Sequence, residues 1–183
     1  MLSAQFNAMR IKLARDVNYF ESKCNESEHA DIMRRAYVRA VFAFIEGYSY
    51  GFRQLSLKIS NEHNGIELAP EEIIALREVE VKVEPSGEVR EYPKYIPAKN
   101  CLAFSIAALA KQHEADYALD KSGQGWEDYL SALKIRDLLM HPKGHDDLQI
   151  ANPEFEKAKG AYNWFVGELG KFEEALLEAK RRA

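Results

Sequence analysis

The last stretch of the chain, residues 154–182, carries an almost strict heptad of apolar residues, and this pattern constrains the fold most. Two interleaved series repeat every seven positions: Phe155, Tyr162, Leu169 and Leu176, together with Ala158, Phe165, Phe172 and Ala179. A period this close to 3.5 residues is typical of a helix that buries one face against other helices. The sequence therefore predicts a long helix in a bundle, and other parts of the chain must supply the helices that cover it.

Residues 28–60 predict a second long helix, whose surface divides into three faces. Bulky apolar residues predict the face that packs in the core: Tyr37, Val41, Phe44, Ile45, Tyr48, Phe52, Leu55 and Ile59. Small residues form a second face, which allows a neighbouring backbone to come close: Ala36, Ala40, Ala43, Gly47 and Gly51. Together with the number of aromatic residues, this face predicts a homodimer with a two-fold interface. The third face holds Arg35, Arg39, Glu46 and Arg53. It is either a solvated charged surface or a place where Glu46 orients an arginine in a site.

Shorter elements occupy the rest of the chain. The periodicity predicts helices at residues 1–24, from Pro70, at about 95–118 and from about Trp126 to His141, followed by a loop from Pro142 to Pro153. Valines alternate with charged residues before Pro85-Ser86-Gly87, which predicts a β-hairpin at about 79–92. The expected fold is all-α: a helical bundle of about five helices with a small inserted β-hairpin, in a single domain over residues 1–183.

The composition excludes several classes of protein. The 183 residues are 46% hydrophobic and 30% charged, an ordinary globular balance that argues against a disordered chain. No apolar run approaches the roughly 20 residues that cross a bilayer, and the first residues lack the pattern of a signal peptide. We therefore expect a cytoplasmic protein that does not contact a membrane. Because the formal net charge is −4, any contact with nucleic acid must use a local basic patch.

The most chemically suggestive segment runs from Arg136 to His141, at the end of a predicted helix. An arginine can clamp phosphate oxygens, and a histidine near its unperturbed pKa transfers protons at neutral pH. This pair suits RNA cleavage, in which the 2′-hydroxyl of the RNA attacks, so no cofactor is predicted. Residues five apart lie about 140° apart on a regular helix. Arg136 and His141 therefore converge only if the helix ends or distorts at Pro142, or if two protomers share a cleft.

The all-α architecture, together with an Arg-x4-His segment whose second residue is the polar Asp137, resembles the HEPN domain family. The resemblance covers roughly residues 28–180 by architecture and rests on Arg136, Asp137 and His141 at the level of the motif. It implies a metal-independent endoribonuclease that works on RNA as a homodimer, whereas other members are toxins paired with an antitoxin protein or inactive binding modules. Under this resemblance Arg136 contacts the scissile phosphate, His141 does acid–base work and Asp137 positions one of them. The family more often has asparagine where this chain has Asp137.

Residues outside the motif extend this candidate site. Glu46 is a candidate supporting acid because of its place on the charged face of the helix at 28–60. Lys143 is a second supporting residue, since it adds local positive charge with Lys134 and His145.

Two other interpretations stay open. In the first, a metal-dependent phosphohydrolase would use the cluster His141, His145, Asp146 and Asp147, whose side chains are of the types that bind zinc or manganese. Pro142 and Gly144 break the helix that would align the two histidines, so a polar loop is the simpler interpretation. In the second, Arg136 only pairs with Glu46, Glu127 or Asp137 while His141 caps the helix, which leaves a binding module.

Overall fold

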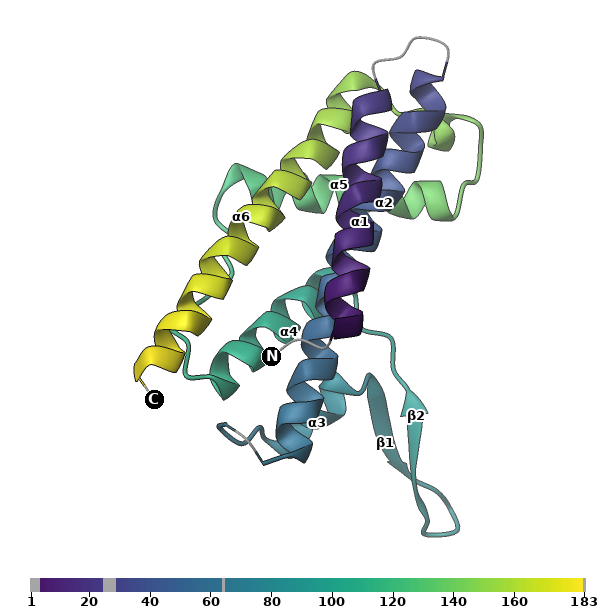
Figure 1. Ribbon diagram of the computed structural model, residues 1–183. Coiled ribbons are helices and arrows are strands. Elements are labelled where there is room, and N and C mark those ends of the chain that lie inside the picture. The colour runs from purple at the N-terminus through teal and green to yellow at the C-terminus, as the bar shows by residue number, and fades with distance from the viewer. Residues whose placement is uncertain (1–3, 25–28, 64, 183) are drawn as a thin grey trace. The chain divides into compact units, whose positions relative to one another are not determined.

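The structure is a computed structural model that describes residues 4–24, 29–63 and 65–182, and helices account for 72% of these residues. In chain order the α-helices are α1 (Ala4–Lys23), α2 (Ala30–Asn61), α3 (Pro70–Leu76), α4 (Ala98–Gln112), α5 (Gln124–Met140) and α6 (Asn152–Arg182) (Figure 1). Strands β1 (Val79–Val83) and β2 (Val89–Pro93) pair antiparallel between α3 and α4, with Val81 opposite Glu91. The mostly helical fold with one hairpin is confirmed.

Some details of the prediction differ from the structure. The described residues form six α-helices rather than about five, because each of the predicted helical segments, including the short one from Pro70, forms a separate helix. The predicted helix starts at residues 1 and 28 lie outside the described residues. The helix expected at 95–118 is shorter, because it begins after Pro97 and ends at Gln112, two residues before Glu114 takes a left-handed φ of 51°. The loop expected up to Pro153 contains a single 3-10 turn at Asp146–Leu148 and ends at Asn152, where α6 begins.

The chain divides into two compact units, each with its own core. The first unit contains Met1–Tyr48 and Asp120–Gly170, and the second contains Ser49–Leu119 and Lys171–Ala183. Helices α2 and α6 each pass from one unit into the other, so the predicted single domain stays a prediction. The motif from Arg136 to His141 lies in the first unit.

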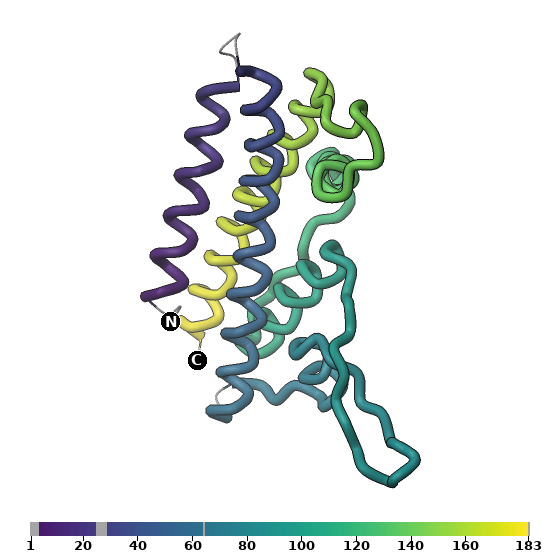
Figure 2. Tube along the Cα trace, turned by 90° about the vertical axis from the view of Figure 1, so that its right-hand side faces the viewer, coloured from purple at the N-terminus to yellow at the C-terminus, as the bar shows by residue number. Residues whose placement is uncertain are grey.

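In the first unit, α1 lies antiparallel beside the first part of α2 (Figures 1 and 2), and the two helices contact each other through Phe6 and Tyr48, whose ring centroids are 5.6 Å apart. A Cβ atom added at Gly47 would lie 2.8 Å from Leu13 Cδ1 of α1. This close approach gives Gly47, on the small-residue face of α2, a role within one chain. At this position the small residue therefore does not itself indicate a second copy.

Aromatic side chains join α2, α5 and α6 in the core of the first unit. Phe165 is fully buried, and its ring contacts those of Phe44 and Tyr48 edge to face. Tyr129 of α5 is also buried and lies 5.5 Å from Trp164, centroid to centroid. These contacts confirm that the apolar stripe of α2 and the heptad of α6 face the core, and they fix the helix that carries the motif.

The second unit contains the rest of α2 and the hairpin. Phe172 of α6 is buried against Phe52 and Tyr117, in agreement with the heptad. Arg53, predicted on the charged face of α2, is buried and forms an ion pair with Glu78 at the start of the hairpin. This burial contradicts a fully solvated charged face, because one of its arginines belongs to the interior of the second unit.

Candidate functional site

His141 lies where α5 ends. Helix α5 stops at Met140, and His141 is its C-terminal capping residue, with a φ of −135° and a backbone N–H that donates to Asp137 O at 3.0 Å. The following Pro142 disfavours helical dihedral angles at His141, which explains why the helix ends here, as the sequence predicts. The imidazole is exposed to solvent, so it can reach a ligand that approaches the end of α5.

Arg136 is held by two carboxylates and an aromatic ring. It forms an ion pair with Glu46 of α2 and a second one with Asp137, in which Nη1 and Oδ1 are 2.9 Å apart. Its guanidinium carbon lies 5.4 Å from the centroid of the Phe42 ring. The side chain is only 21% exposed, and its Nε is buried with no hydrogen-bond partner among the described residues. Glu46 therefore pairs with Arg136, and its supporting role in a site stays a prediction.

The charge of Arg136 is more than balanced by its neighbours. One guanidinium faces two carboxylates, so these three side chains together carry a net negative charge when all are ionised. Phosphate oxygens must displace part of this pairing or share the guanidinium with it. The side chains around Arg136 therefore hold the arginine in place, but their net charge does not attract a phosphate.

The charged face of α2 continues toward the end of α5. Arg39 Nη2 donates a hydrogen bond to Leu139 O at 3.2 Å, and this carbonyl belongs to the last turn of α5. Among the described residues, Arg39 has no acidic partner, which distinguishes it from Arg136 and from Arg35. An arginine is favourable near the negative end of a helix dipole, so this contact places a cation two residues before His141 in the chain.

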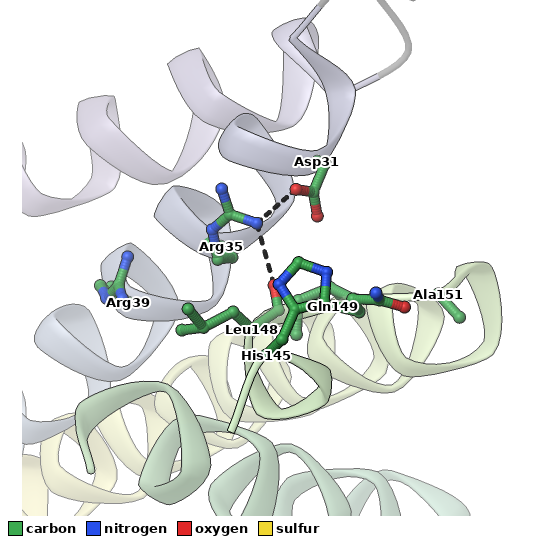
Figure 3. Close-up of a pocket in the computed structure, with 8 residues that line it drawn as sticks. Asp31, Arg35, Arg39, His145, Leu148, Gln149 and Ala151 are labelled. Carbon is green, nitrogen blue, oxygen red and sulfur yellow. Dashed lines mark hydrogen bonds and ion pairs between the residues drawn. The ribbon is translucent and has the colours of Figure 1, made fainter. Parts of the chain in front are cut away.

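A pocket of about 650 Å³ lies beside Arg39 (Figure 3). Its polar lining includes Arg35 and Arg39 from α2 and His145 from the segment after α5. Arg35 forms an ion pair with Asp31, and its Nη1 also donates to Leu148 O at 2.9 Å. The sequence predicts Arg35 and Arg39 on one face of α2, but it does not predict that His145 lies beside them. The four-residue spacing of Arg35 and Arg39 was the available signal, since such residues are neighbours on a helix.

The loop after His141 is organised by Asp147. Its Oδ2 accepts backbone hydrogen bonds from Lys143 at 2.7 Å and from Gly144 at 3.1 Å. The structure contains no group of three or more His, Cys, Asp or Glu side chains arranged to hold a metal within its described residues. The predicted cluster of His141, His145, Asp146 and Asp147 is thus not brought together, because Asp147 turns toward the loop backbone. The side chain of Lys143 is exposed, and its supporting role stays a prediction.

Comparison with known proteins returns no match: no family model, no curated protein and no solved structure matches this chain. Across the described ranges, no helix has the length and apolar character needed to cross a membrane. The resemblance to HEPN domains therefore rests on the residues of the motif and on the helical architecture around them.

Proposed function

We propose that the protein is a metal-independent endoribonuclease of HEPN type, with Arg136 as the phosphate contact and His141 as the acid–base group. The observation that supports this most is the arrangement at the end of α5. The two terminal nitrogens of Arg136 pair with Glu46 and Asp137, and His141 follows at an exposed helix end. Such fixed orientation is what a group that stabilises transition-state charge requires.

The proposed reaction is an internal transesterification. The 2′-hydroxyl of a ribose attacks the adjacent phosphorus, the bond from phosphorus to the 5′-oxygen breaks, and the products are a 2′,3′-cyclic phosphate and a 5′-hydroxyl. The proton lost by the 2′-hydroxyl and the proton gained by the 5′-oxygen are exchanged with the site and with water. His141 serves one of these transfers, and Arg136 stabilises the negative charge that grows on the phosphate oxygens.

The activity should not depend on a metal ion. Purified protein is expected to cleave single-stranded RNA at the same rate with and without EDTA, because the nucleophile belongs to the substrate and the charges to side chains. Loss of cleavage in EDTA would instead favour a metal-dependent hydrolase. A complete lack of cleavage, with RNA still bound, would favour a binding module. The charge balance at Arg136 is the observation on which that second candidate rests.

We also propose a homodimer with its interface near the motif. Leu138 and Met140, on the last turn of α5, are 45% and 53% exposed although both are large and apolar. Apolar residues beside a candidate site favour a protein partner there, and a two-fold interface would bring two copies of the motif together. Light scattering at micromolar concentration should give twice the mass of the chain, and Leu138→Glu should lower it. A monomer in the wild type would contradict the shared cleft.

A further inference from the structure

The charge balance at Arg136 raises the question of which residues attract an RNA strand. Each nucleotide brings one negative phosphate, and binding to nucleic acid depends on cations that neutralise phosphates. Arg136 is already matched by Glu46 and Asp137. The positive charge must therefore come from side chains next to the motif rather than from the motif.

The pocket in Figure 3 supplies such side chains. Arg39 lines it without an ion pair to any described residue, and its guanidinium donates a hydrogen bond to Leu139 O. Arg35 lies one helical turn earlier on α2 and shares its charge with Asp31. The imidazole of His145 adds a further hydrogen-bond donor to the same space. Leu148 and Ile150 provide apolar surface beside these groups.

The pocket borders the motif along the chain at two points. Arg39 binds the carbonyl of Leu139, two residues before His141, and His145 follows His141 by four residues. Four residues span at most about 14 Å even when fully extended, so the Cα atom of His145 lies within that distance of the Cα atom of His141. One RNA strand can thus contact both places with nucleotides that are close in its sequence.

We propose that this pocket is a phosphate subsite for RNA, which holds the backbone of a nucleotide next to the scissile one. The proposal rests on the proposed function, since it assigns the pocket to the same substrate. Arg39 is the principal phosphate contact, and His145 donates a further hydrogen bond. Asp31 competes with the phosphate for Arg35, so it limits the affinity.

The test uses an RNA oligonucleotide in which every 2′-hydroxyl is methylated, so that it binds but cannot be cleaved. Fluorescence anisotropy should show about 10-fold weaker binding of this RNA to Arg39→Gln than to the wild type. The slope of the logarithm of the binding constant against the logarithm of the salt concentration should fall by about 1, as expected for the loss of one phosphate contact. Glutamine removes the charge but keeps a donor for Leu139 O. Arg15→Gln is the matched control, because Arg15 is exposed on α1 outside the pocket. It should bind within about 2-fold of the wild type.

A second variant tests the subsite in the opposite direction. Asp31→Asn removes the carboxylate that pairs with Arg35, so it should tighten RNA binding by up to about 5-fold, as expected for loss of one competing surface ion pair. Unchanged binding in Arg39→Gln would overturn the proposal, because Arg39 is the principal phosphate contact, and unchanged binding in Asp31→Asn would remove Arg35 from the subsite. The proposal would also be overturned if a mononucleotide bound as tightly as the RNA and with the same dependence on Arg39, because the pocket would then be a site for a free nucleotide.

Cleavage of ordinary RNA is measured separately, so the two proposals can fail independently. Arg39→Gln should raise the RNA concentration needed for half-maximal cleavage and leave the rate at saturation unchanged. If the wild type binds RNA through Arg39 but never cleaves it, the ribonuclease assignment fails and the subsite stands. If cleavage occurs and Arg39→Gln behaves as wild type in both assays, only the subsite fails.

Discussion

A His141→Ala variant is expected to cleave RNA roughly 100- to 10,000-fold more slowly than the wild type, which is the range contributed by a positioned acid–base group. The fold should be unaffected. His141 is exposed, and its contact with α5 is a backbone N–H bond to Asp137 O, which alanine can also make. Initial rates on a labelled single-stranded RNA give the effect on cleavage, and circular dichroism with thermal unfolding verifies the fold.

The matched control for this variant is His29→Ala. His29 is also an exposed histidine of the first unit, and it lies outside both the motif and the pocket. Its replacement should leave the cleavage rate within about 2-fold of the wild type, because surface changes away from a site have small effects. Equal activity of His141→Ala and the wild type would remove His141 from the mechanism.

Gly125→Ala is expected to lower the free energy of unfolding by about 1–3 kcal/mol, the usual cost of adding volume to a packed site. A Cβ atom at this position would lie 2.5 Å from Trp164 Cβ and 2.6 Å from Trp164 Cγ. The backbone fixes the Cβ atom of Trp164, so a change of its rotamer cannot relieve this overlap. Urea unfolding measures the change, and because α5 carries Arg136 and His141, the same variant should also lose part of the cleavage rate.

Gly167→Ala is the control for Gly125→Ala, because it makes the same chemical change in a helix of the same unit. Nothing lies within 4 Å of a Cβ atom added at Gly167, which is an exposed position of α6. Alanine should therefore stabilise the protein by about 0.5–1 kcal/mol through its better helix propensity. If the two variants changed stability in the same direction, the packing of Trp164 against α5 would be contradicted.

Periodicity was sufficient to predict the long helices. Phe165 and Tyr37 are fully buried because they fall on apolar stripes that repeat with the helical period. The end of α4 had no comparable signal. Helices commonly end at a glycine in the left-handed region, whereas here Glu114 takes that conformation, and neither its type nor its neighbours indicate it.

In the candidate site, too, the sequence indicates contacts between residues that are close in the chain but not contacts between different helices. From the sequence, the candidate partners of Arg136 are Glu46, Glu127 and Asp137. Asp137 is adjacent in the chain, but the pairing with Glu46 depends on which helix covers the charged face of α2. The sequence does not predict the pocket, because its lining combines arginines of α2 with His145, which is more than one hundred positions away in the chain. A single sequence does not show which residues that are distant in the chain lie close together in space.

The chemical ends of the RNA fragments test the assignment of Arg136 and His141 most directly. Wild-type protein is incubated with RNA in EDTA, and the fragments are analysed by mass spectrometry, with His141→Ala treated in parallel. We predict fragments that end in a 2′,3′-cyclic phosphate and begin with a 5′-hydroxyl, and no cleavage where the attacking 2′-hydroxyl is replaced by hydrogen. Fragments with a 5′-phosphate, or equal cleavage by His141→Ala, would contradict the assignment.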